Sequence, residues 1–280
     1  MTGKVIVGDS TGKARWANKI FIGDSNGKAK EVQAIYVGDS NGIARKVWPL
    51  SPLPAAYQQV EYIYNSTGAP YINTEITANN YTRVLIDFQC KSHEISSFYS
   101  NMIPFGICNI YYRSSSTYHE GSNFGLEYTF LSSSGQASTR NRFTIMFGDY
   151  SNSYELNTSD ENTMQRHVLD INRSGGSIYW DDTYLTTIQT TFASRGNPFI
   201  LFGYSSKYYL NEDETINGTG GVFKYYLYHF TAWQNDVVVR DMYPCYRKSD
   251  FKVGMIDIIN NNKFYTNPSG TDDFYKGPNV

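Results

Sequence analysis

The chain has 280 residues, a formal net charge of −2 and 18% charged residues, while aromatic residues make up 16% and include 25 tyrosines. This composition excludes a nucleic-acid-binding protein, because phosphate contacts need clustered Lys and Arg and the sequence has no basic run. A surface kept soluble by Tyr, Ser, Asn and Thr suits an all-β protein that contacts carbohydrate or other proteins. The sequence also lacks a run of 18 apolar residues, so membrane insertion is not expected.

Residues 1–48 contain three copies of a 15-residue repeat, each built around Gly-Asp-Ser-Asn/Thr-Gly. They hold eight Lys or Arg against four acids, whereas the rest of the chain holds sixteen against twenty-two, which indicates two different modules. A period of 15 residues fits two short strands joined by a tight turn. We expect three β-hairpin repeats that attach the protein to a partner or join copies of the chain, because such hairpins cannot bury a face alone.

Each repeat also fits G-x-S-x-G, the nucleophile elbow of hydrolases. An elbow needs a helix after the serine, together with a His and an acid from elsewhere in the fold. Here a strand-like segment follows each copy, and residues 1–54 contain no His. Ser10, Ser25 and Ser40 are therefore interpreted as turn residues, not as nucleophiles.

The segment 49–54 reads Pro-Leu-Ser-Pro-Leu-Pro and predicts a linker, since proline stops a strand ladder. Beyond it, short alternating segments recur every ten to fifteen residues between turn signals. Val84, Ile86 and Phe88 lie on one face of such a segment, which is the period-two pattern of a half-buried strand. With no convincing helix, residues 55–280 are predicted to form a two-sheet β-sandwich of the jelly-roll type.

The near end of this second domain reads Tyr-x-x-Val-Glu-Tyr-Ile followed by Ser-x-Gly-x-x-Tyr-Ile-x-Thr, and the far end contains Arg-Asp-x-x-Pro. In these motifs both ends are similar to the concanavalin A-like, laminin-G-like domains of phage and prophage tail proteins. At the far end, Arg240, Asp241 and Pro244 match a turn of those domains, whose role is expected to be structural. The repeats of residues 1–48 also resemble units that precede such domains in prophage tail proteins. The similar residues at the near end are Tyr57, Val60, Glu61, Tyr62, Ile63, Ser66, Gly68, Tyr71, Ile72 and Thr74.

The resemblance covers roughly residues 54–276 and implies a non-enzymatic receptor-binding or adhesion protein of a phage tail or baseplate. Its expected partners are host cell-surface glycan, other tail proteins and further copies of the chain, with a homotrimer favoured. A purely structural tail protein without glycan binding is the alternative. The N-terminus lacks a signal-peptide pattern, so we expect assembly in the bacterial cytoplasm and a final location in the virion tail.

Aromatic residues beside polar ones in loop contexts are the candidate carbohydrate site, because sugar rings stack on Tyr and Trp while polar groups bind their hydroxyls. The alternative for Trp180 is a place in the core, and for Tyr112 and Tyr118 it is packing against the rim of a sheet. Trp233 is not a candidate and is predicted to lie in the core, because it shares a strand face with Tyr225 and Leu227. The candidate residues are Tyr112, Arg113, Tyr118, His119, Glu120, Trp180, Tyr208 and Tyr209.

No cofactor is expected, although calcium binds at the sandwich rim of some laminin-G-like relatives. Asp181 and Asp182 are the candidate ligands here, and a plain hairpin turn is the alternative. A glycosidase needs two carboxylates about 5–9 Å apart, but Glu127 and Asp257 each stand alone in the sequence, so catalysis is the third hypothesis.

The chain has three cysteines, Cys90, Cys108 and Cys245, which cannot all pair with one another. They are expected to be reduced and buried.

Overall fold

The computed structural model divides the chain into two compact units, residues 1–52 and 53–280. Every described element is a strand, a turn or a loop. The all-β prediction is therefore confirmed for the described part of the chain. The structure describes residues 6–8, 14–16, 21–23, 29–31, 35–38, 44–48, 53–66, 70–92, 99–107, 110–113, 116–119, 123–131, 140–148, 153–158, 164–188, 196–207, 214–217, 224–268, 270 and 273–280.

The first unit contains three two-stranded antiparallel pairs in which the same register recurs. A β-branched residue faces a basic residue in each pair, as in Val7 opposite Arg15 and Ile22 opposite Lys30. The third pair repeats this arrangement fifteen residues further on. Ser10, Ser25 and Ser40 lie outside the described residues. The strands are β1 (Ile6–Gly8), β2 (Ala14–Trp16), β3 (Phe21–Gly23), β4 (Ala29–Glu31), β5 (Ile35–Gly38) and β6 (Ala44–Trp48).

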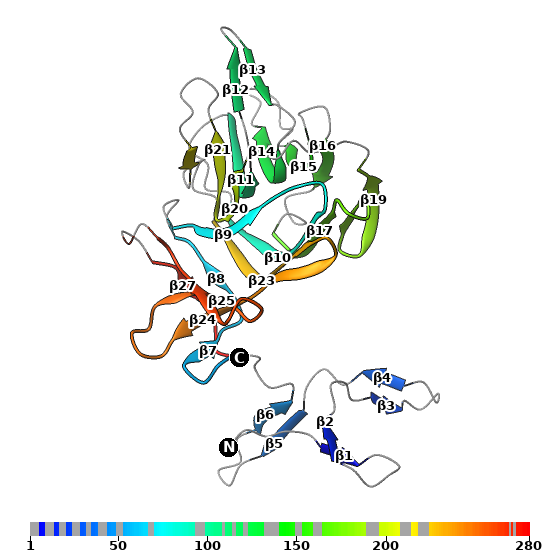
Figure 1. The fold of residues 1–280 in the computed structure, drawn as a ribbon, viewed down its shortest axis with the longest axis vertical. Helices are drawn as coiled ribbons and strands as arrows, with labels where there is room; N and C mark the ends of the chain where they lie inside the picture. Colours follow the sequence, from blue (N-terminus) through cyan, green and yellow to red (C-terminus); the bar gives the residue numbers. More distant parts are fainter. Residues whose placement is uncertain are drawn as a thin grey trace. The chain divides into compact units, whose positions relative to one another are not determined.

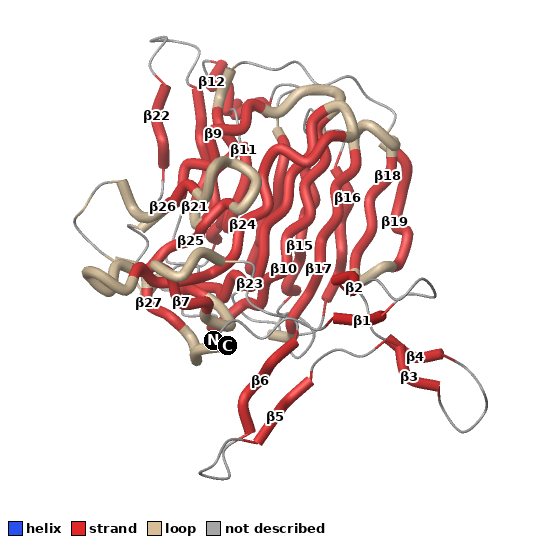
Figure 2. The backbone as a smooth tube through the Cα atoms, turned by 60° about the horizontal axis from the view of Figure 1, so that its bottom comes forward, coloured by secondary structure: helices blue, strands red, loops and turns tan. Residues whose placement is uncertain are grey.

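The second unit is a β-sandwich (Figure 1). Its larger sheet has eleven strands, with the main path β19-β18-β17-β10-β23-β24-β25-β26, and several of these run side by side in Figure 2. Strand β7 joins the sheet by pairing with β24, β8 pairs with β23, and β27 pairs with β8. The members are β7 (Tyr57–Gln59), β8 (Ile63–Tyr64), β10 (Thr82–Ser92), β17 (Arg166–Asn172), β18 (Ser177–Trp180), β19 (Thr183–Thr187), β23 (Lys224–Gln234), β24 (Val237–Arg247), β25 (Val253–Asp257), β26 (Lys263–Tyr265) and β27 (Tyr275–Lys276).

The opposing sheet has six strands in the order β16-β15-β14-β11-β21-β22. Its pairings are antiparallel except for β11 with β21, which run parallel. Two further pairs, β9 with β20 and β12 with β13, are also antiparallel. These strands are β9 (Ile72–Thr77), β11 (Tyr99–Ile107), β12 (Ile110–Arg113), β13 (Ser116–His119), β14 (Phe124–Leu131), β15 (Arg140–Met146), β16 (Ser153–Thr158), β20 (Pro198–Leu201), β21 (Gly203–Lys207) and β22 (Glu214–Asn217).

The core lies between the two sheets and is rich in aromatic rings. Phe88 of β10 packs edge-on against Phe105 of β11, with ring centroids 5.3 Å apart, and this contact joins the sheets. Val84, Ile86 and Phe88 are fully buried, as their alternation in the sequence predicts. The residues between them therefore point to the outer face of the sheet, and they include the polar groups described below.

A β-bulge in β23 changes which of its residues face the core. Asp87 pairs with His229 but Phe88 pairs with Leu227, so Tyr228 is the additional residue in the ladder. Leu227 is buried before the bulge and Phe230 after it. Because this step is three residues and not two, the alternation is reversed for the rest of the strand. The outer face of the sheet therefore includes Trp233, which the uninterrupted alternation assigned to the core.

The two described cysteines, Cys90 and Cys245, are buried and free, as expected. Burial raises the pKa of the Cys90 thiol and raises that of Cys245 to about 12. Cys108 lies outside the described residues. A helix long and apolar enough to cross a membrane is not found in the described part of the chain.

Candidate functional site

The predicted carbohydrate residues on the aromatic loops fall mainly in the β12–β13 pair. In its register Tyr111 lies opposite Tyr118, and Arg113 lies opposite Ser116. Tyr112 and His119 lie on the same two short strands. The side chains of both strands are outside the described part of the structure. Glu120, Tyr208 and Tyr209 are also outside the described residues. The binding role of these residues therefore stays a prediction.

Trp180 belongs to the core, which corrects its assignment to the sugar-binding set. Its side chain is 9% exposed, and its ring centroid lies 5.3 Å from that of Phe143 and 4.7 Å from that of His167. Because β18 alternates, Ile178 and Trp180 share the inner face. Tyr179, the intervening residue, is the aromatic side chain that this strand presents outward.

Asp181 and Asp182 form the turn between β18 and β19, with φ values of 49° and 62°. The carboxylate of Asp181 is engaged: one oxygen lies 2.7 Å from Nδ1 of His167, and the other accepts a hydrogen bond from the Val168 amide. Within the described residues, no cluster of three or more His, Cys, Asp or Glu is arranged to hold a metal ion. Asp181 therefore stabilises the hairpin turn, whereas Asp182 is exposed.

A groove of about 340 Å³ lies on the outer face of the larger sheet, along strands β10, β17 and β18. Strand β17 forms its floor. Residues 168, 170 and 172 of this strand point outward, and the stretch from the first to the last is about 13 Å long. Its lining is mainly polar, with one aromatic ring and two apolar side chains, so it suits a ligand that is rich in hydrogen-bonding groups. The lining residues are Arg83, Leu85, Val168, Asp170, Asn172, Ser177, Tyr179 and Asp182.

The groove contains a bidentate ion pair between Arg83 and Asp170. Nε and Nη2 of Arg83 donate hydrogen bonds of 2.9 and 2.6 Å to the two carboxylate oxygens. These hydrogen bonds raise the pKa of the guanidinium above its usual value. The ring of Trp233 lies 4.5 Å from the guanidinium carbon, and this contact fixes the plane of the group. Nη1 makes no hydrogen bond within the described residues and can therefore donate to a ligand.

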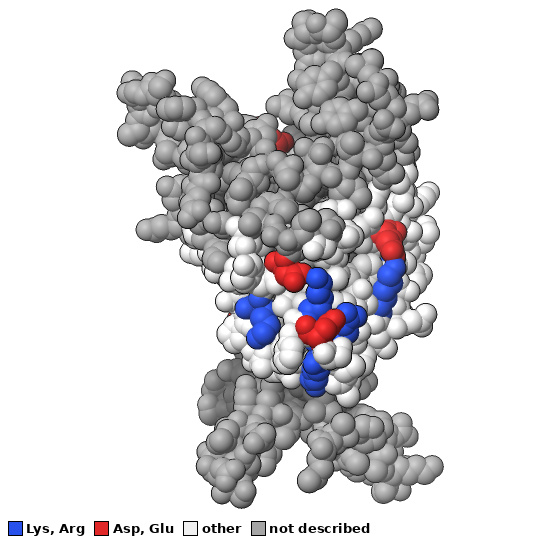
Figure 3. Space-filling model, turned by 90° about the vertical axis from the view of Figure 1, so that its left-hand side faces the viewer, with Lys and Arg blue, Asp and Glu red and all other residues white. Residues whose placement is uncertain are grey.

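Polar side chains continue across the same face beyond the groove. Asp87 accepts two hydrogen bonds from Arg166, whose guanidinium lies 3.8 Å from the ring centroid of Tyr228. Burial raises the pKa of Tyr228 to about 12. Further along, His229 Nε2 lies 2.7 Å from Asp241 Oδ1. Basic and acidic groups thus lie beside one another on this face, as they also do on the side of the molecule in Figure 3.

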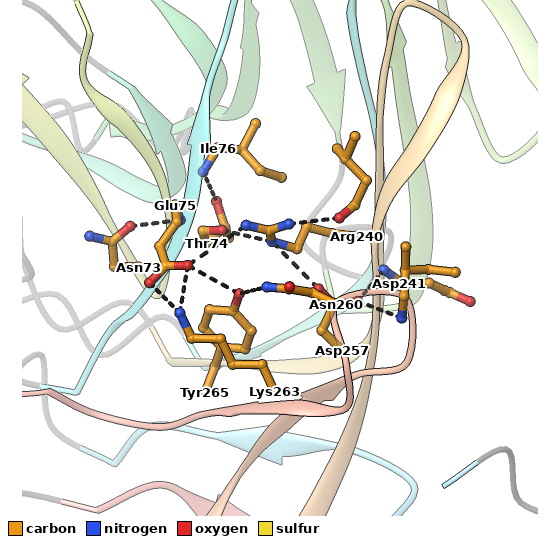
Figure 4. A network of polar contacts seen from close by, with 12 residues as sticks. Asn73, Thr74, Glu75, Ile76, Arg240, Asp241, Asp257, Asn260, Lys263 and Tyr265 are labelled. Atoms are coloured by element: carbon orange, nitrogen blue, oxygen red, sulfur yellow. Dashed lines mark hydrogen bonds and ion pairs between the residues drawn. The ribbon is translucent and has the colours of Figure 1, made fainter.

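Arg240 and Asp241 are part of strand β24 and not of a turn, which corrects the position expected for them. Arg240 donates to the carbonyl oxygens of Thr74 and Val239, at 3.0 and 2.7 Å, so its expected structural role is confirmed. Its Nε also lies 3.5 Å from Asp257 Oδ2. Figure 4 shows these residues in one polar network. Asp241 bonds to His229 and not to Arg240.

The carboxylates considered for glycoside hydrolysis do not line the groove. Asp257 is fully buried in β25 beside Arg240, and Glu127 is 7% exposed in β14 of the other sheet. Two other carboxylates, Asp170 and Asp182, do line it. Both oxygens of Asp170 accept hydrogen bonds from Arg83, so this carboxylate is engaged in an ion pair within the fold.

Arg83, Asp170 and Tyr179 were not identified from the sequence. Arg83 and Asp170 lie 87 positions apart, and only the strand order β18-β17-β10 brings them together. Alternation in the segment Ser-Ile-Tyr-Trp could have identified Tyr179, because Ile178 and Trp180 occupy the opposite face.

No protein-family model matches the chain, and no curated protein matches it at a significant level. The fold and the groove define a β-sandwich protein with a polar and aromatic groove on the outer face of its larger sheet.

Proposed function

We propose that the chain is a phage or prophage tail protein whose β-sandwich binds host-surface carbohydrate without cleaving it. The observation that carries the binding role is the groove beside Tyr179. A tyrosine ring offers a stacking surface for the C–H face of a sugar, and Nη1 of Arg83 offers a hydrogen bond to its hydroxyls. The side-chain oxygen of Asn172 accepts a hydrogen bond from the Gly175 amide, so Nδ2 is the atom of this side chain that can donate to a ligand. The tail context rests on the resemblance of residues 54–276 and of the repeats to phage proteins.

In this proposal the N-terminal hairpins attach the sandwich to a tail or baseplate, or join copies of the chain, with a trimer favoured. Two-stranded hairpins are marginal alone, so their identical registers suit a module that is completed by a partner. Several copies on one virion engage a polysaccharide at once, so a modest affinity for each site is sufficient. The predicted loop residues Tyr112, Arg113, Tyr118 and His119, together with Glu120, Tyr208 and Tyr209, would supply a second contact.

The test is binding of the full-length protein to a glycan array and to purified bacterial wall and capsular polysaccharides. Tyr179→Ala should weaken binding about tenfold, since stacking and apolar contact with the ring are lost. Tyr179→Phe keeps the ring and should bind within a few-fold of wild type. The matched control is Tyr275→Ala, which removes a tyrosine that is 51% exposed on β27, away from the groove.

Three outcomes separate the hypotheses. Loss of binding in Tyr179→Ala with retention in the control supports the groove. Absence of binding to every glycan indicates a structural tail protein and overturns the proposal. Release of reducing ends from a polysaccharide also overturns it, in favour of a glycosidase that uses the groove carboxylates.

A further inference from the structure

The carboxylate of Asp182 is a charged group of the groove that has no partner among the described residues. It makes no hydrogen bond or ion pair within the described part of the chain, and its residue is exposed. Asp181, the preceding residue in the turn, is by contrast held by His167 and the Val168 amide. Asp182 therefore offers a carboxylate to a ligand at one end of the groove, beside Val168.

The remaining charges of the groove cancel one another. Among the described residues that line it, Arg83 is the one cation, and both oxygens of Asp170 accept hydrogen bonds from that guanidinium. Nearby on the sheet, Arg166 is paired in the same way with Asp87. The described lining residues thus carry an excess of one negative charge, located at Asp182. A ligand with a carboxylate or phosphate at that end would be repelled, and one with an ammonium group would be attracted.

The charge of Asp182 lies at one end of the groove and not at its middle. Asn172 and Ser177 lie at one end of the lined stretch, the Arg83–Asp170 pair lies near its middle, and Asp182 lies at the end beside Val168. Tyr179 lines the groove between these ends, opposite Asp170 in the register of β17 and β18. A sugar stacked on this ring would extend substituents toward Asp182.

We propose that the groove selects a glycan with a free amino group, a hexosamine whose ammonium group pairs with the carboxylate of Asp182 while its ring stacks on Tyr179. The inference rests on the proposed carbohydrate-binding function and specifies its ligand class. Nη1 of Arg83 donates to a hydroxyl of the same or the adjoining sugar. N-acetylation removes the positive charge and lowers affinity, and a uronic acid binds least.

The experiment is calorimetric titration of the full-length protein with three oligosaccharides of equal length, made of glucosamine, N-acetylglucosamine and galacturonate. At low salt the glucosamine oligomer should bind about fivefold more tightly than the N-acetylated one, as a solvent-exposed ion pair allows. High salt should reduce this ratio toward one. Asp182→Asn should lower the affinity for the glucosamine oligomer to that for the N-acetylated one, so that the ratio falls to about one.

Asn adopts positive φ as readily as Asp, so the variant keeps the turn. The control is Asp273→Asn, which removes the same charge from an ion pair with Lys252 outside the groove. It should leave the ratio unchanged. Equal binding of the two hexosamine oligomers, or an equal effect of both variants, overturns the amino-sugar inference but not carbohydrate binding. Absence of binding to these oligomers and to every polysaccharide of the array overturns the proposed function itself.

Discussion

Nε and Nη2 of Arg83 contact the two carboxylate oxygens of Asp170 at 2.9 and 2.6 Å, across two neighbouring strands. The side chains are 33% and 13% exposed, so the pair is only partly in solvent. Because Trp233 covers the guanidinium as well, Arg83 is held in one orientation with Nη1 directed away from the pair. This pair therefore fixes the positions of both side chains in the middle of the groove.

Arg83→Ala should lower the free energy of unfolding by about 2 kcal/mol, because the largely buried carboxylate of Asp170 loses its partner. Urea denaturation measures the loss. Arg247→Ala removes the same bidentate geometry with Asp250 from an exposed turn and should have a much smaller effect. Equal losses for the two variants would contradict a stabilising role for the Arg83–Asp170 pair.

The two tryptophans of the sandwich should respond differently to truncation. Trp180→Ala should cost about 3–5 kcal/mol, because it leaves a cavity beside Phe143 in the core. Trp233→Ala should cost about 1 kcal/mol, since it removes mainly the contact with Arg83 on the outer face. Thermal or urea unfolding of both variants checks the order. If Trp233→Ala lowered the free energy of unfolding more than Trp180→Ala, Trp233 would be a core residue. The bulge at Tyr228 would then not have moved it to the outer face.

The fold class was predictable because alternation is a local property of each strand. Val84, Ile86 and Phe88 are buried as their spacing requires. The position of Trp233 was not predictable, because a single additional residue in the ladder reverses the alternation and nothing in the local sequence marks Tyr228 as that residue.

The groove was less predictable than the fold because it depends on the strand order. Alternation shows that Tyr179 and Asp170 each face outward, but not that β17 and β18 are neighbours. The aromatic residues in loop contexts were predicted as the site instead, and Trp180, the candidate whose side chain is described, lies in the core.

The two described thiols should be unreactive in the folded protein. Burial raises the pKa of Cys90 and brings that of Cys245 to about 12, so thiolate is scarce at neutral pH. In a Cys108→Ser variant, an aromatic disulfide reagent should therefore modify neither cysteine until denaturant unfolds the sandwich. Rapid modification of the native variant would show that one of these sites opens locally.

A network around Glu75 should make stability depend on pH (Figure 4). Nζ of Lys263 lies 2.5 and 2.6 Å from the Glu75 carboxylate oxygens, and this contact lowers the pKa of Glu75 below its ordinary value of 4.5. A carboxyl group whose pKa is lower when folded stabilises the protein above its unfolded pKa, and this contribution disappears as the pH falls through the folded pKa. Glu75→Gln should therefore be less stable than wild type at neutral pH, and the difference should shrink below about pH 4.5.

Lys263→Met is the control for this prediction, because it removes the main cause of the lowered pKa and leaves the carboxylate in place. Its stability relative to wild type should follow the same pH profile, since both variants lose the same contact. The double variant should add little to either single change. Urea unfolding of the four proteins between neutral pH and pH 3 measures the profile. A difference that stays constant down to the lowest pH would show that Glu75 contributes by packing and not by its charge.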